Sequence, residues 1–455
     1  MLVTLSGLLF GLGTSRLRAD VTTPALQVAT SLTPKTVLLF TTPGAGNQTG
    51  TDWKNAMPIG SLQKALKSAR PGLGFLIGFD ATGFKPAALD QNQFYIRVSG
   101  DEKKPVFVQA GLIAGEDAVD AAPMDAAAFF TSAQPWSLAD FAKQKGSACF
   151  AIANGASHLR LTGFRVDGTP ADGFFKFRGK EPTNFSDIVI SNIDAKNVGR
   201  VIETEHWAML QNVIVSDCRA VGIVRGFARF RNLSNAEFRN LDLDAANMDA
   251  GGKNVCQLIS FQAGENVLFE NITLRNALNQ PPPPEEGKEP GYVQGDGIVC
   301  ERKTKNVTIR NCQASNMGDG GFDLKTTNVT IEDSSTDSCK FGARIWAVGD
   351  NVIRRCEFRN PKSRNGTQGA CVQVGGTVQI FDSKLHAGPG TVAVRLHQAK
   401  KADAPYALMQ GGSIETEGDG AVVGANAAGV LELRDVMVNG VATSHRYVFD
   451  KKKEG

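Results

Sequence analysis

The sequence lacks the short motifs that mark several large enzyme classes. It has no nucleophile elbow, no phosphate-binding loop and no Rossmann fingerprint. Its five histidines are scattered, without the spacing of metal ligands, and no CxxC pair occurs. A zinc site is therefore not expected.

A strong excess of charge of either sign is also lacking. Lysine and arginine number 49 against 46 acidic residues, a net charge of +3. No basic tract or RNA-type aromatic motif occurs, so we expect no nucleic-acid partner.

Long apolar runs are confined to the start, MLVTLSGLLFGLG. This run is too short to span a bilayer comfortably, but it has the length of a signal-peptide core. A basic segment before it and an A-x-A cleavage site after it are both missing; a buried N-terminal strand or helix is the alternative. We predict that residues 1–33 are a leader or a disordered N-terminus. We expect a secreted or periplasmic protein with no integral membrane segment.

The local sequences around the eight cysteines do not indicate a disulfide framework. VSDCRA, IRNCQA and IRRCEF each place a cysteine at one position of a recurring phrase, where a small buried side chain would stack on its neighbours. We therefore predict free thiols, with Cys218, Cys312 and Cys356 facing inward.

A repeated phrase dominates the chain from about residue 150 onward. NVTIRNCQASN (306–316) is followed by NVTIEDSSTDS (328–338) and NVIRRCEFRN (351–360). A period of about 22 residues is typical of a solenoid, and short strands with polar turns favour a parallel β-helix over a β-sandwich. The recurring asparagine suits a turn, because asparagine tolerates left-handed backbone geometry.

The repeat predicts one domain over residues 34–455. The segment 58–72 is expected to form an amphipathic helix, with Ser61 as N-cap, that covers one end of the strand stack. Loop insertions are expected near 113–148 and 276–295, the second because of its run of prolines. The predicted stacked core includes Val307, Ile309, Phe322, Leu324, Val329 and Ile331.

Glycine-led strands in three successive turns gather charged residues on one face. Alternation places Val299, Asp323 and Arg344 in one outward column. Glu301, Lys325 and Trp346 form the next column, and Asp296 and Asp319 lie in the turns that lead into the strands. Outward charges on a solenoid are often simply solvated. Clustered carboxylates, however, suit a hard cation with oxygen ligands.

The stretch CQASNMGDGGFDLK (312–325) resembles the family-9 polysaccharide lyases, pectate lyase-like proteins with a right-handed parallel β-helix. The resemblance implies an all-β, single-stranded right-handed parallel β-helix with an N-terminal capping helix. It implies that Asp296, Asp319 and Asp323 bind Ca²⁺. Arg344 takes the position of the catalytic lysine, and Gly320 stands where the family has a further aspartate.

The resemblance predicts cleavage of a uronate-containing acidic polysaccharide by Ca²⁺-assisted β-elimination. Arg344 or Lys325 would be the base. Substrate-binding side chains would be Trp346, Glu301, Arg225, Lys176 and Arg178. The alternatives are a uronate C5-epimerase that uses the same site, a non-catalytic glycan-binding or structural β-helix, and a hydrolase.

Overall fold

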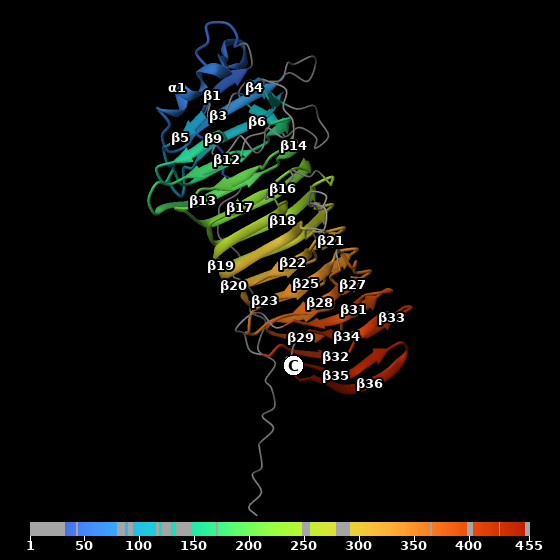
Figure 1. Ribbon diagram of the computed structural model, residues 1–455. Helices are drawn as coiled ribbons and strands as arrows, with labels where there is room; N and C mark the ends of the chain where they lie inside the picture. Colours follow the sequence, from blue (N-terminus) through green and yellow to red (C-terminus); the bar gives the residue numbers. More distant parts are fainter. Residues whose placement is uncertain are drawn as a thin grey trace, which may run out of the picture.

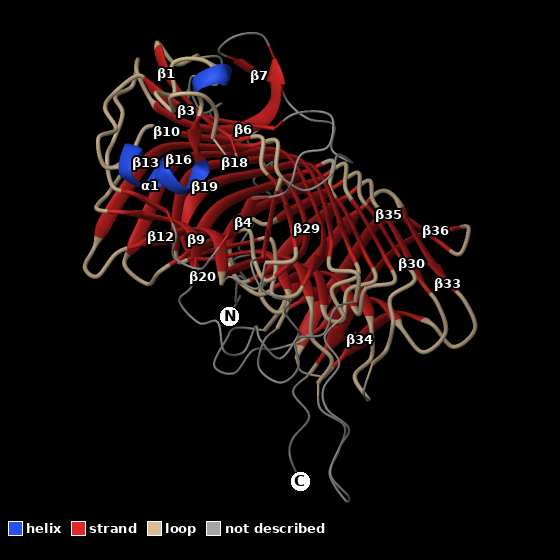
Figure 2. Ribbon diagram, turned by 90° about the horizontal axis from the view of Figure 1, so that it is seen from above, coloured by secondary structure: helices blue, strands red, loops and turns tan. Residues whose placement is uncertain are grey.

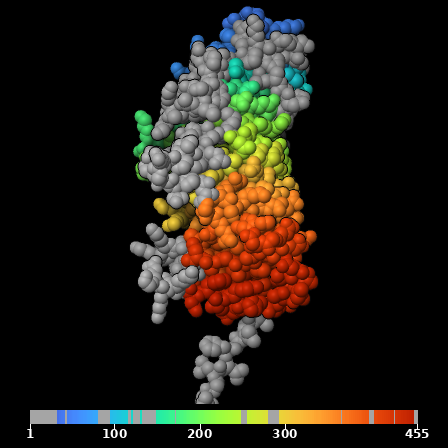
Figure 3. Space-filling view, turned by 45° about the vertical axis from the view of Figure 1, so that its right-hand side comes forward, coloured from blue at the N-terminus to red at the C-terminus, as the bar shows by residue number. Residues whose placement is uncertain are grey.

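The protein folds as a parallel β-helix. The computed structural model describes residues 32–41, 44–79, 87–89, 94–114, 118–120, 129–132, 148–169, 172–247, 255–278, 292–364, 366–397, 404–426 and 428–450. In Figures 1 and 3 successive turns follow one another along one axis, from the N-terminal blue to the C-terminal red. Neighbouring turns are about 4.8 Å apart. The all-β solenoid predicted from the repeat is confirmed.

Each turn contributes to three parallel sheets, which we number. Sheet 1 contains β5 (Phe94–Ile96), β9 (Ala148–Ala153), β12 (Gly173–Arg178), β15 (Ile202–Thr204), β17 (Ala228–Phe230), β22 (Gly320–Leu324), β25 (Phe341–Ile345), β28 (Ala370–Val374), β31 (Val392–Leu396) and β34 (Ala421–Ala425), and the predicted glycine-led strands belong to it. Sheet 2 contains β1 (Thr36–Thr41), β3 (Leu73–Phe79), β6 (Val106–Ala114), β10 (Leu159–Thr162), β13 (Thr183–Ser191), β23 (Thr327–Glu332), β26 (Val352–Arg354), β29 (Thr377–Phe381) and β32 (Tyr406–Gln410). Sheet 3 contains β4 (Ala87–Leu89), β8 (Phe130–Ser132), β11 (Arg165–Asp167), β14 (Asp194–Val198), β21 (Gln313–Ser315), β24 (Ser335–Asp337), β27 (Glu357–Arg359), β30 (Lys384–Ala387) and β33 (Ser413–Thr416).

Five long strands pass from one sheet to the next without a break. They are β16 (Ala208–Ile223), β18 (Asn232–Asp244), β19 (Gln257–Arg275), β20 (Asp296–Arg310) and β35 (Gly429–Val438). Strand β2 (Met57–Pro58) pairs with β1, whereas β7 (Ala118–Asp120) and β36 (Val441–Phe449) run antiparallel to β6 and β35. Strand β36 therefore covers the last turn of sheets 2 and 3.

The interior consists of side chains stacked on their equivalents in the next turn. Val307 lies opposite Val329 and Ile309 opposite Ile331. Phe322 lies between Ile298 and its partner in β25, and all of the predicted core residues are buried. The eight cysteines are free and buried, which confirms the predicted free, inward-facing thiols.

Asparagines with positive φ form the corner between sheets 1 and 2. Asn266, Asn306 and Asn328 have φ values of 59°, 56° and 57°. The Asn306 amide donates to Asn266 Oδ1 at 3.0 Å, and the Asn328 amide donates to Asn306 Oδ1 at 3.1 Å. One residue type thus supplies both the left-handed backbone and a hydrogen-bonded ladder between turns.

The N-terminal end of the core is covered by a helix, as predicted, but the helix is shorter than 58–72. It consists of η2 (Ile59–Ser61) followed by α1 (Leu62–Leu66), and a further turn, η1 (Trp53–Asn55), precedes them. Figure 2 shows α1 beside the first turns. Leu62 and Leu66 are buried in the main core. Ser61 precedes α1, but its hydroxyl bonds the Pro58 carbonyl instead of capping the helix.

The predicted insertions fall partly outside the described residues. Most of the predicted leader, residues 1–31, lies outside them, and so do residues 279–291 of the second insertion. Within 113–148, the described residues include β7 and β8 instead of only loop. Strand β8 pairs with β11, so this part of the segment belongs to the solenoid.

Exchanges at Asn306 test the asparagine corner. Asn306→Ala loses both the amide ladder and a residue that tolerates positive φ, so we expect a loss of about 1–3 kcal/mol. Asn306→Gly keeps the backbone freedom and should lose less. Urea unfolding of the three proteins measures this order; equal losses for alanine and glycine would contradict the backbone role.

Candidate functional site

The register of sheet 1 brings the predicted charged residues together. Asp323 on β22 lies opposite Val299 on β20 and opposite Arg344 on β25, as the alternation predicted. Glu301 and Lys325 are joined at 2.9 Å between Lys325 Nζ and Glu301 Oε1. The site is therefore built on three consecutive turns of a rigid sheet.

Asp319 and Asp323 are held by different donors. Arg344 Nη1 donates a hydrogen bond to Asp319 Oδ2, and the Tyr292 hydroxyl donates to Asp319 Oδ1 at 2.6 Å. Asp323 Oδ1 accepts from Trp346 Nε1 at 2.7 Å. Lys325 Nζ lies 3.1 Å from Asp323 Oδ2.

Within the described residues, Asp296 is bonded to the backbone instead of to a cationic or aromatic side chain. Its Oδ1 accepts the Gly320 backbone N–H at 2.9 Å. Burial, followed by the charges of Asp319 and Asp323, raises the pKa of Asp296 well above its usual range. The protonated form of Asp296 is thus favoured.

The carboxylates point outward from the core, but they are not solvated. Asp296, Asp319 and Asp323 are 5%, 7% and 4% exposed. The alternative of simply solvated charges is therefore not what the structure shows, and Tyr292 and Arg344 both pair with Asp319. We call Asp296, Asp319, Asp323, Arg344 and Tyr292 the acidic cluster.

The cations around the acidic cluster fall into two classes. For both Arg344 and Lys325, burial lowers the pKa, but the neighbouring carboxylates outweigh it and raise the pKa overall. Lys340 differs, because burial lowers its pKa to about 8. Its Nζ lies 3.7 Å from the centre of the Tyr292 ring and, within the described residues, has no hydrogen-bond partner.

The expected Ca²⁺ does not fit the side chains as they lie. The Arg344 guanidinium bonds Asp319, and its Nε lies 3.7 Å from Asp323 Oδ1. Within the described ranges, no group of three or more His, Cys, Asp or Glu side chains is arranged to hold a metal ion. The carboxylates converge, as the sequence predicted, but around a guanidinium.

Sequence reasoning missed Tyr292 and Lys340. Tyr292 precedes Asp296 by four residues in the proline-rich segment, and Lys340 directly precedes β25. Neither position belongs to a recognisable motif, so only the folded contacts identify them.

The other predicted substrate-binding residues lie in a different cluster. Lys176 and Arg225 both pair with Asp172, at 3.0 and 2.6 Å. Arg178 lies 3.8 Å from Glu205. Strands β15, β17, β19 and β20 separate this cluster from β22, so the structure does not bring it to the acidic cluster.

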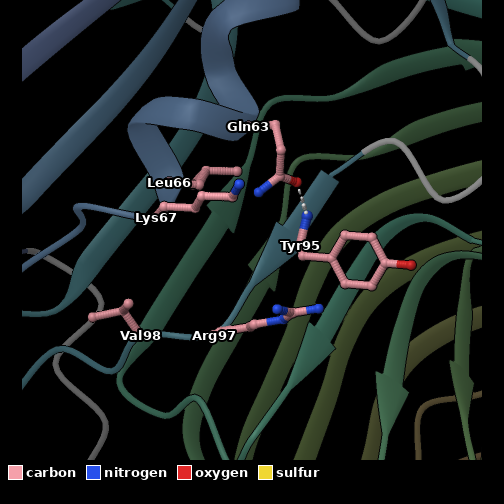
Figure 4. A pocket seen from close by; sticks show the side chains of 6 residues that line it. All are labelled: Gln63, Leu66, Lys67, Tyr95, Arg97 and Val98. Atoms are coloured by element: carbon pink, nitrogen blue, oxygen red, sulfur yellow. Dashed lines mark hydrogen bonds between the residues drawn. The ribbon is translucent and has the colours of Figure 1, made fainter.

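A cavity of about 380 Å³ lies at the N-terminal end, remote from the acidic cluster. Figure 4 shows its lining side chains: Gln63, Leu66, Lys67, Tyr95, Arg97 and Val98. Gln63 accepts the Tyr95 backbone N–H at 2.6 Å, and the Arg97 guanidinium stands 4.8 Å from the centre of the Tyr95 ring. The cavity therefore lies between the capping helix and the first strand of sheet 1.

A family model described as "Right handed beta helix region" matches residues 252–403. This agrees with the predicted handedness of the solenoid. No curated protein matches the chain significantly. Among the described residues, no helix has the length and apolar character needed to cross a membrane.

Several solved structures are similar in fold. Pectate lyase Pel9A has 14% identity over 91% of this chain and 82% of its own, with a TM-score of 0.34. The alginate lyase from Paenibacillus sp. str. FPU-7 has 12% identity over 89% and 99%, with a TM-score of 0.35. The catalytic domain of a GH87 alpha-1,3-glucanase has 8% identity over 78% and 61%, with a TM-score of 0.43. These similarities concern architecture.

Asp296 gives the acidic cluster a definite pH dependence. Its folded pKa is raised, so the stability due to its protonation is present below about pH 3.9, its unfolded pKa, and is lost as the pH rises. Asp296→Asn keeps an acceptor for Gly320 but cannot ionise. We expect equal stability near pH 4 and a melting temperature raised by about 2–4 °C at pH 7.

Thermal unfolding of the wild type and Asp296→Asn across this pH range tests the prediction. A variant that is less stable than the wild type at pH 7 would show that the ionised carboxylate is required.

Proposed function

We propose that the protein is a polysaccharide lyase that cleaves a uronate-containing glycan by β-elimination. The observation that supports this most is a pair of permanently charged cations, Arg344 and Lys325, fixed beside the partly exposed ring of Trp346 on the outer face of sheet 1. A sugar ring can stack on an indole while its carboxylate meets the cations.

β-Elimination makes defined demands on such a site. A base removes the proton from C5, next to the uronate carboxylate, and the electron pair moves into that carboxylate as an enolate. The C4–C5 double bond then forms as the C4–O bond breaks, and the leaving oxygen takes a proton. Arg344 and Lys325 meet the demand for charge stabilisation, because fixed cations stabilise the negative charge that develops on the enolate.

Arg344 and Lys325 are, however, poor bases. The carboxylates raise the pKa of both, so both stay protonated. Lys340 suits proton abstraction better, because burial brings its pKa to about 8. We assign the base to Lys340, which substrate would reach once Tyr292 moves from its place over the ammonium.

No step in this proposal uses Ca²⁺, since the acidic cluster as it lies does not fit the ion. A polymeric substrate agrees with the secreted or periplasmic location predicted from the apolar N-terminal run.

A glycoside hydrolase is the second candidate, and the raised pKa of Asp296 favours it. A protonated carboxyl near an ionised one is the pattern of paired acid and base in hydrolysis. The products separate the candidates: a lyase leaves an unsaturated uronate, whereas a hydrolase leaves a saturated sugar. An epimerase leaves the chain uncut, and a non-catalytic protein only binds it.

The protein is incubated with a panel of acidic polysaccharides, and cleavage is measured by the ultraviolet absorbance of the unsaturated uronates that a lyase forms. Arg344→Gln should lower kcat/KM by about 10²–10³-fold, the loss typical of removing one charge-stabilising donor. Arg395→Gln is the matched control, because Arg395 lies in the same column two turns further on. The lyase proposal would be contradicted if the wild type cleaved a polysaccharide without forming the absorbance of unsaturated uronates. Full activity in Arg344→Gln would contradict it as well.

The role of Lys340 predicts a pH profile. Its neutral form is the base, so wild-type kcat/KM should rise with pH through about 8. Lys340→Met keeps the bulk of the side chain and should lower kcat by about 10²–10⁴-fold. A folded Lys340→Met variant that retains activity with the same pH profile would place the base elsewhere.

A further inference from the structure

The acidic cluster contains its own cation. Arg344 bonds Asp319 and approaches Asp323, and its side chain is only 13% exposed. Its guanidinium carbon lies 5.0 Å from the centre of the Phe341 ring and 4.7 Å from that of Trp346. Carboxylates and aromatic faces together fix the guanidinium in place.

With Arg344 in place, this environment suits a guanidinium and not a hydrated metal ion. Ca²⁺ takes six to eight oxygen ligands. Phe341 and Trp346 supply no oxygen, and two carboxylate oxygens already accept from Tyr292 and from Trp346 Nε1. A metal at this position would have to displace Arg344 and find further ligands.

Gly320 lies against Asp323, Asp296 and the Arg344 stem. A Cβ placed on Gly320 would lie 3.2 Å from Asp323 Cβ, 3.3 Å from Asp296 Oδ1 and 3.5 Å from Arg344 Cδ. A longer side chain there would compete with the Arg344 stem for the same space. The absence of a side chain at 320 thus keeps the space between Asp296, Asp323 and the Arg344 stem free.

We propose that Arg344 is the resident cation of the acidic cluster, and that it excludes divalent metal from Asp296, Asp319 and Asp323. The Arg344 guanidinium carries the positive charge that a metal ion would otherwise supply. This inference concerns the cluster and holds whichever reaction the protein catalyses. It has one further consequence: removing the guanidinium should turn the cluster into a metal site.

Metal binding by the full-length protein tests the proposal directly. Tb³⁺, which binds oxygen sites much as Ca²⁺ does, is titrated while its luminescence is excited through Trp346, and melting temperatures are measured with and without about 10 mM Ca²⁺. The wild type and Arg395→Gln should show neither sensitised luminescence nor a thermal shift. Arg344→Gln should show both, with a shift of about 1–3 °C.

Further variants separate the outcomes. Adding Asp323→Asn to Arg344→Gln should abolish the acquired binding, because it removes a ligand. Saturable Ca²⁺ stabilisation of the wild type that Asp319→Asn abolishes would overturn the proposal, and this test does not require Arg344→Gln to fold. Failure of a folded Arg344→Gln to bind either ion would also overturn it, since the guanidinium would then not occupy a cation position.

Discussion

The parallel register between successive turns is the constraint on which the rest of the structure depends. A shift of one residue would turn every side chain of a strand to the opposite face. The asparagine corner opposes such a shift, because Asn266, Asn306 and Asn328 need both a positive φ and an amide partner in the next turn. The same register that stacks Ile309 on Ile331 also places Arg344 beside Asp323.

Much of this could be predicted from the sequence, because a solenoid turns sequence spacing directly into position. The recurring N-V-T phrase located the corner, and alternation along the glycine-led strands identified the column of Val299, Asp323 and Arg344. The inward cysteines followed from the same reasoning.

The remaining features depend on side-chain packing across turns. Whether an outward aspartate is solvated depends on what lies over it, and Tyr292 comes from a segment without any repeat. The lowered pKa of Lys340 arises from its burial, and its ammonium lies against the ring of that same tyrosine. Lys176 lies in β12 and Arg225 in the bend before β17, and both pair with Asp172 in a cluster of their own.

A fold of this kind does not by itself determine a reaction. The function must therefore be argued from the acidic cluster, and its central feature is a guanidinium among carboxylates. A crystal structure determined after soaking with Ca²⁺ and a uronate oligosaccharide tests this most directly. We predict the sugar carboxylate beside Arg344 and Lys325, with Arg344 still on Asp319 and no metal between the aspartates. A metal peak coordinated by Asp296, Asp319 and Asp323, with Arg344 turned away, would contradict the account.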